Sequence, residues 1–229
     1  MTKQKISFLL LCGMASLVIV LGNTALTRPG SDQGKPRPNI NLAVGGQILR
    51  FDQGYLFRTN SPTRSEKDQI TLIAQFPDLR PFTQFTTDKE ARQRRVLITL
   101  KPMDESRGEI APEDRPSRLY ARYLKPATGG VEKGLLQRHF EPGSPYQSED
   151  LFISPPDGRT FYARCSRPNP QADVIEESCF TEIRHAGLEI RILFAPDMLG
   201  RWSLLTDGVR TLLNKALKDG AEAARAQTG

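Results

Sequence analysis

The sequence predicts an α+β fold, in which a mostly antiparallel sheet carries one long C-terminal amphipathic helix and an N-terminal transmembrane helix precedes both. Many short segments alternate apolar and polar residues, as half-buried strands do. Only the last of them runs into a long series of apolar residues at helical spacing. Strands and helices do not alternate along the chain, so a parallel sheet is not expected.

The N-terminal end begins with residues 1–5, a short basic stretch that we interpret as a cytoplasmic tail. Residues 6–26 carry no charge, and as a helix these about 21 residues would span roughly 30 Å, the hydrocarbon thickness of a bilayer. We interpret them as a transmembrane anchor or uncleaved signal that crosses a bacterial inner membrane once. Secretion to the periplasm after signal cleavage is the alternative, although Asn23 occupies a position where a small residue is preferred.

A linker and a single extracytoplasmic domain are expected to follow. Residues 27–38 contain three prolines and two glycines without apolar periodicity, which is typical of an extended linker. The domain is predicted over residues 39–219. Its first strand is expected at residues 40–44, followed by a hairpin of residues 47–51 and 55–59 around the turn residues 52–54. Residues 70–76 are expected to form a strand that ends before Pro77, with a short helix as the alternative, and residues 96–100 a short strand that stops at Pro102.

The middle of the chain is less regular. Residues 103–116 are charged and punctuated by prolines, which predicts an exposed loop. Short strands are expected at residues 118–124, 135–140 and 151–153. The proline-rich stretch 140–156 is a candidate partner-binding loop, with Tyr146 and Phe152 as its contact residues, and a packed irregular connection is the alternative.

A hairpin of residues 179–185 and 188–194 has the clearest pattern in the chain. Ala186 and Gly187 suit a two-residue turn. If His185 pairs with Leu188, the apolar residues of both strands share one face. On the other face Arg184 then opposes Glu189, and Glu182 opposes Arg191. A slip of one residue would turn every apolar side chain outward, so this register is strongly favoured.

Residues 161–165 are expected to form a third strand beside this hairpin. Pairing Cys165 with Cys179 also places Ala163 opposite Thr181 and Phe161 opposite Ile183, and the apolar face stays coherent. Neighbouring cysteines in this arrangement are close enough for a disulfide, and two reduced buried cysteines are the alternative. A disulfide requires an oxidising compartment and favours the periplasm. If the disulfide does not form, a domain that faces the cytoplasm is the alternative.

The last element is a helix of about five turns. Asp197 suits its N-cap, and Asp219 and Gly220 suit its end, which leaves residues 220–229 as a flexible tail. One apolar stripe runs along it at three- and four-residue steps and predicts packing on the sheet. The stripe consists of Met198, Trp202, Leu205, Val209, Leu212, Leu213, Ala216 and Leu217.

The chemistry available in the sequence is limited. The formal net charge of +6 does not predict nucleic-acid binding, because most of it lies in the first 38 residues. The only histidines, His139 and His185, have no neighbour at a metal-ligand spacing, and no cofactor or catalytic motif is present. No metal, cofactor or catalytic residue is therefore assigned, although His139, Ser144 and Asp150 are conceivable members of a hydrolase site.

These observations favour a non-enzymatic protein held at the inner membrane through residues 6–26. We expect it to bind an unknown protein partner in the periplasm, as a component of an envelope complex or as an inhibitor of a toxin. The alternative is an extracytoplasmic hydrolase whose site is not visible as a motif.

Overall fold

The computed structural model describes residues 37–56, 69–82, 90, 93–104, 106, 108–126, 130–167 and 178–228. The predicted tail and membrane segment, residues 1–26, and most of the predicted linker lie outside the described residues. Within the described ranges, no helix is both long and apolar enough to cross a bilayer.

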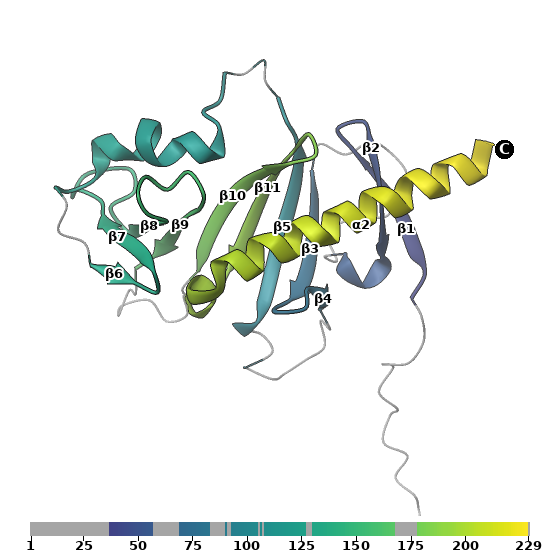
Figure 1. Cartoon of the computed structure of the whole chain (residues 1–229), viewed down its shortest axis with the longest axis horizontal. Coiled ribbons are helices and arrows are strands. Elements are labelled where there is room, and N and C mark those ends of the chain that lie inside the picture. The colour runs from purple at the N-terminus through teal and green to yellow at the C-terminus, as the bar shows by residue number, and fades with distance from the viewer. Residues whose placement is uncertain are drawn as a thin grey trace, which may run out of the picture. The chain divides into compact units, whose positions relative to one another are not determined.

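The described strands form one large and one small sheet, and all their pairings are antiparallel (Figure 1). The small sheet pairs β1 (Asn39–Val44) with β2 (Gln47–Asp52). The predicted α+β class with its antiparallel sheet is thereby confirmed. The large sheet has the order β4 (Arg80–Pro81), β3 (Ile70–Gln75), β5 (Arg95–Pro102), β11 (Leu188–Phe194), β10 (Cys179–His185), β9 (Tyr162–Ser166), β8 (Glu149–Ile153), β7 (Leu135–His139) and β6 (Val131–Glu132).

The C-terminal helix α2 (Trp202–Thr228) covers one face of the large sheet and runs on toward β2 (Figure 1). Its buried stripe packs in the main core with the apolar residues of β3, β5, β10 and β11, so the predicted packing is confirmed. A 3-10 helix, η6 (Pro196–Arg201), precedes it, and the residue before η6, Ala195, makes no side-chain capping bond. Asp197 therefore lies in the first turn of η6 and is not the N-cap that its position suggested.

The end of α2 differs from the expectation that Asp219 and Gly220 terminate it. The helix continues through Gly220 to Thr228, because Ala221, Ala223, Ala224 and Ala226 are strong helix formers. Gly220 has a packing role instead of a terminating one. A Cβ at this position would lie 2.1 Å from the carbonyl oxygen of Ile48 in β2, so only glycine allows this approach.

Replacing Gly220 with alanine is expected to lower the free energy of unfolding by about 1–3 kcal/mol, the usual cost of overpacking. The added methyl group meets backbone, which cannot rotate away. Urea unfolding followed by circular dichroism measures the effect. Gly208→Ala on the same helix is the matched control, because its methyl group meets only Leu79 Cδ1 at 3.0 Å, the end of a flexible side chain. Equal effects of the two substitutions would contradict the prediction.

The first hairpin pairs β1 with β2, whereas the sequence predicted a hairpin of residues 47–51 and 55–59. Gly45 and Gly46, with φ of 57° and 71°, form the turn between β1 and β2. Two consecutive residues with positive φ are typical of a tight hairpin turn, and glycine adopts them without strain. The predicted turn residues instead begin the 3-10 helix η1 (Gln53–Tyr55), where Asp52 Oδ1 accepts a hydrogen bond from the amide of Gly54 at 2.6 Å.

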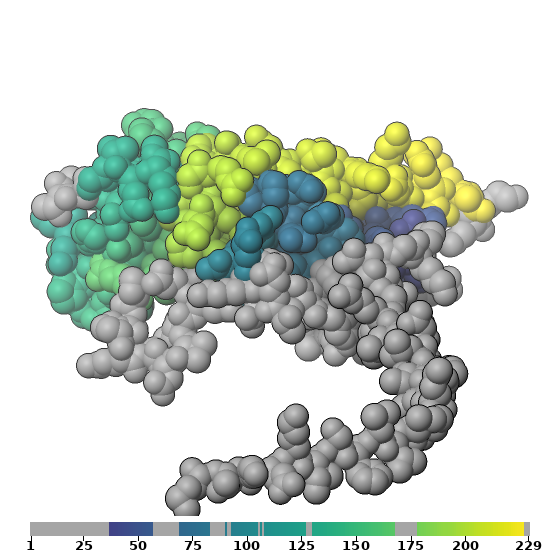
Figure 2. Space-filling view, turned by 90° about the horizontal axis from the view of Figure 1, so that it is seen from below, coloured from purple at the N-terminus to yellow at the C-terminus, as the bar shows by residue number. Residues whose placement is uncertain are grey.

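The half of the sheet formed by β6, β7, β8 and β9 has its own apolar cluster, and Figure 2 shows this teal and green part gathered beside the yellow-green residues of the C-terminal hairpin. Short helical turns cover it: η3 (Pro112–Asp114), the π-helix η4 (Pro116–Tyr120) and η5 (Ala121–Tyr123). The strand predicted at 118–124 is therefore wrong. Tyr120, Tyr123 and Leu124 pack into the cluster at helical spacing, which the alternating interpretation overlooked.

Candidate functional site

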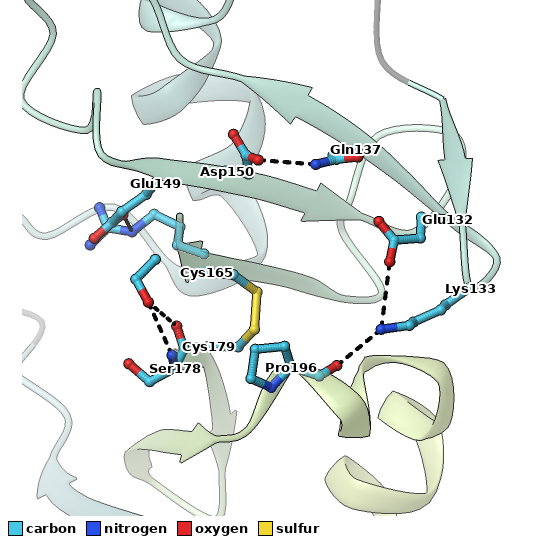
Figure 3. The surroundings of a disulfide bond; sticks show 11 residues. Glu132, Lys133, Gln137, Glu149, Asp150, Cys165, Ser178, Cys179 and Pro196 are labelled. Carbon is cyan, nitrogen blue, oxygen red and sulfur yellow. Dashed lines mark hydrogen bonds and ion pairs between the residues drawn. A yellow bond between two sulfur atoms is a disulfide. The ribbon is translucent and has the colours of Figure 1, made fainter. Parts of the chain in front are cut away.

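The hairpin of β10 and β11 has the predicted register along its whole length, from His185 opposite Leu188 to Cys179 opposite Phe194. Cys165 of β9 lies opposite Cys179, and the two form a disulfide with their Cα atoms 4.0 Å apart (Figure 3). The predicted disulfide is confirmed. It lies in the core, since both cysteines are buried.

The pairing of β9 with β10 ends immediately after the disulfide. Only Cys179 and Phe180 have partners on β9, whereas β9 remains paired with β8 up to Tyr162 opposite Ile153. The predicted pairs of Ala163 with Thr181 and of Phe161 with Ile183 therefore do not form. The longer ladder with β8 carries the start of β9 away from β10, and the sheet splits.

A partly open pocket of about 190 Å³ lies at the split. Residues from both strands line it, together with η3, the turn before β9 and α2. They are Pro112, Glu113, Arg159, Thr160, Phe161, Tyr162, Thr181, Glu182, Ile183, Arg184 and Arg210. We call this the β9–β10 cleft.

Glu182, which lines one wall of the β9–β10 cleft, is bonded to Arg115, which is 9% exposed. Its Nη1 donates to Glu182, its Nη2 donates to Glu189 Oε1 at 3.0 Å, and its Nε donates to the carbonyl of Ile110 at 3.0 Å. The hydroxyl of Tyr162 donates to Glu182 Oε2 at 2.8 Å across the split. These bonds join the two halves of the sheet where the backbone ladder does not.

The protonation states in this wall are fixed by their surroundings. Burial alone would lower the pKa of Arg115, but the neighbouring carboxylates, Glu182 first among them, raise it above its ordinary value. Burial and the charge of Glu182 both raise the pKa of Tyr162. Arg115 therefore stays cationic and Tyr162 stays a hydrogen-bond donor at neutral pH.

The sequence did not predict this wall. Residues 103–116 were expected to be an exposed loop, but Pro112, Arg115 and Pro116 are buried. Glu182 and Glu189 were expected opposite Arg191 and Arg184, which the register confirms, but the ion pairs that both glutamates form with Arg115 were not predicted. The sequence did contain one indication of this wall: Glu182 and Glu189 lie on the same face of the hairpin, and two half-buried carboxylates on one face require a cation.

Two arginines that line the β9–β10 cleft, Arg184 on the same strand face as Glu182 and Arg210 on α2, form no ion pair with a carboxylate of the described part of the chain. Arg210 Nη1 donates to the carbonyl of Arg184 at 3.3 Å, and the buried Nε of Arg184 has no hydrogen-bond partner. Thr181 is 1% exposed and its hydroxyl is also without a partner. Arg159 at the exposed rim pairs with Asp114 at 3.3 Å. The cleft is therefore cationic and contains unused hydrogen-bonding capacity.

A second hollow of about 310 Å³ lies between β2 and α2. Its cationic residues, Arg50 and Lys215, are matched in number by Asp52 and Asp219. None of its lining residues carries a buried polar side-chain atom without a partner. The β9–β10 cleft is thus the better candidate site.

The two residues of the candidate partner-binding loop lie apart. Phe152 is 6% exposed and belongs to the main core, whereas Tyr146 packs against the second cluster on the opposite face of β8. The ring of Tyr146 contacts those of Tyr120 and Phe140, and the Arg164 guanidinium lies 4.5 Å from its centroid. Partner binding by this loop stays a prediction, and the burial of Phe152 removes that side chain from its surface.

Of the conceivable hydrolase residues, two are in contact. His139 Nδ1 lies 2.8 Å from Asp150 Oδ1. Asp150 also accepts hydrogen bonds from Gln137 at 3.0 Å and from Arg167 Nε at 2.6 Å. The hydroxyl of Ser144 is buried and makes no hydrogen bond, so it is not bonded to His139. The aspartate connects β7, β8 and the residue after β9, which is a structural role.

Replacing Asp150 with asparagine is expected to lower the free energy of unfolding at pH 7 by about 1.5–3 kcal/mol, the range for hydrogen bonds to a charged group. Burial alone would raise the pKa of Asp150, but bonds from Arg167 and His139 hold it below its ordinary value. Its stabilisation is thus present above the unfolded-state pKa of about 3.9 and is lost as pH falls through the folded-state pKa. Urea unfolding at pH 7 and pH 3 should show the deficit of the variant shrinking in acid, and Asp157→Asn on an exposed turn is the control. A deficit that is equal at both pH values would refute this explanation.

Among the described residues, no group of three or more histidine, cysteine, aspartate or glutamate side chains is arranged to hold a metal ion. In the two described pockets, the side-chain hydroxyl that is bonded to a carboxylate is that of Tyr162, and burial and Glu182 raise its pKa, so it stays protonated at neutral pH. The groups of the β9–β10 cleft that have no partner, Arg184 Nε and the Thr181 hydroxyl, are suited to binding.

No family model matches the chain, and no curated protein matches it in sequence. Two solved structures are similar in fold. One is an immunity protein of the Stenotrophomonas maltophilia type IV secretion system, with a TM-score of 0.54 and 14% identity over 78% of this chain and 92% of that chain. The other is the iron-regulated outer membrane lipoprotein of Neisseria meningitidis, with a TM-score of 0.47 and 12% identity over 80% of this chain and 97% of that chain. At 14% identity the likeness to the immunity protein shows the fold alone.

Proposed function

We propose that this chain is an immunity-type protein of the cell envelope, which binds a protein toxin and neutralises it without catalysing a reaction. The observation that carries the proposal is the fold shared with an immunity protein over 92% of that protein's length. The disulfide supports an oxidising compartment. We further propose that residues 6–26 anchor the chain in the inner membrane and hold the domain in the periplasm.

A competition between sister strains tests the proposed function. A strain lacking this chain should be killed in contact with its parent, and expression of the full chain should restore survival. Crosslinking in intact cells, followed by purification of the membrane fraction, should recover one protein that kills the deletion strain when it is directed to the periplasm. The proposal would be contradicted if both strains survived equally and no specific protein were crosslinked.

A further inference from the structure

The backbone of β10 provides the first argument about the β9–β10 cleft. In an antiparallel ladder, successive residues direct their N–H and C=O groups alternately to the two neighbouring strands. His185 and Leu188 close a two-residue hairpin, so His185, Ile183 and Thr181 direct their groups to β11. Glu182 and Arg184 must then direct theirs toward β9. The contact of Arg210 with the carbonyl of Arg184 agrees with this assignment.

The split therefore leaves backbone groups directed into a pocket. The ladder with β9 stops at Phe180 opposite Arg164, so it provides no partner strand for Glu182 and Arg184. Thr181, the residue before Glu182, also lines the pocket, and its hydroxyl is buried and unpartnered. Converging amide and hydroxyl donors are the groups that bind an anionic oxygen.

Charge decides which occupant fits. Glu182 already accepts bonds from Arg115, which it shares with Glu189, and from the Tyr162 hydroxyl. Among the described residues, Arg184 and Arg210 have no carboxylate within ion-pair distance, and Glu113 is the one other acidic residue that lines the cleft. An anionic group is therefore favoured there and a cationic one is opposed.

The size of the pocket limits the occupant further. A volume of about 190 Å³ corresponds to about six water molecules, at roughly 30 Å³ each. That is room for one side chain of a partner, and not for a helix or a strand.

We propose that the β9–β10 cleft receives a single aspartate or glutamate side chain of the protein partner. The carboxylate is held by Arg184, Arg210, the hydroxyl of Thr181 and the amides of Glu182 and Arg184. This inference rests on the proposed function only in taking the partner to be a protein. It adds to that function an acidic residue at the centre of the interface.

The test titrates the ¹⁵N-labelled full chain in detergent with N-acetyl-glutamate N-methylamide and follows the amide signals by NMR. The matched probe is the glutamine analogue, which has the same shape without the charge, and inorganic phosphate is a third probe. We expect the glutamate probe to shift the amide signals of Glu182 and Arg184 and to bind about tenfold more tightly than the glutamine probe, since charged hydrogen bonds are the stronger ones. Equal binding of both analogues, no shifts, or binding of phosphate alone would overturn the proposal.

Variants separate binding from folding. Arg184→Gln and Arg210→Gln should each weaken the glutamate probe about tenfold, whereas Lys218→Gln on the exposed side of α2 should leave it unchanged. Thr181→Val removes a hydroxyl that is unpartnered in the fold, so it should weaken the probe without lowering the unfolding temperature. Unchanged probe affinity in all three cleft variants would overturn the proposal.

The two proposals fail in different ways. If the strains survive equally but the glutamate probe binds the cleft, the immunity function fails and the carboxylate site stands. If the deletion strain is killed but the probe does not bind, the site fails and the immunity function stands.

Discussion

Replacing Arg115 with methionine is expected to lower the free energy of unfolding by about 3–5 kcal/mol, the usual cost of removing one partner from a buried ion pair. Arg115 is the cation between Glu182 and Glu189, whose side chains are 14% and 18% exposed. Without it, both carboxylates stay partly desolvated and uncompensated, and the bridge across the split retains only Tyr162. Urea unfolding at pH 7 measures the loss.

Two further variants show whether charge is the cause. Arg118→Met lies in the adjacent helix η4, where its side chain is 68% exposed, and it should change stability by less than about 0.5 kcal/mol. Combining Arg115→Met with Glu182→Gln and Glu189→Gln removes the uncompensated charges and should recover most of the loss. A triple variant as unstable as Arg115→Met would show that lost packing, and not charge, dominates.

Removing the disulfide by replacing Cys165 and Cys179 with alanine is expected to cost about 3 kcal/mol, the chain-entropy estimate for a loop of roughly 15 residues. The bond closes a loop with a sequence separation of 14. It also joins β9 and β10 one residue pair before the split begins, so its loss should favour extension of the split. Chemical unfolding of the two proteins under oxidising conditions measures the difference.

Reduction provides the control for this second prediction. A reductant should destabilise the natural protein to about the level of the double alanine variant and leave that variant unchanged. If the reductant affects both proteins equally, the loss does not come from this disulfide.

Features that depend on neighbouring strands could be predicted from the sequence. The hairpin of β10 and β11 has a two-residue turn and two agreeing side-chain patterns, so one register satisfies both. Cys165 followed from the same register, because a third strand must continue the apolar face. The stripe on α2 has the same local character, since helical spacing alone determines which residues face the sheet.

Features that depend on distant residues could not be predicted. Arg115 and Glu182 are 67 positions apart, and nothing near Arg115 in the sequence indicates that it enters the protein interior. Gly220 resembles a helix terminator until the carbonyl of Ile48 is known to approach it. The split depends on whether β9 pairs more strongly with β8 or with β10. The sequence of one strand does not show which of these two ladders is the longer.

The disulfide lies one residue pair from the end of the β9–β10 ladder, and this position has a mechanical consequence. A side chain that pushes β9 and β10 apart puts the largest force on the residue pairs nearest to the split. Backbone hydrogen bonds at that point would break one after another and the sheet would peel. A covalent bond there stops the peeling, so the strands can yield at the open end of the cleft while the two halves of the sheet stay joined.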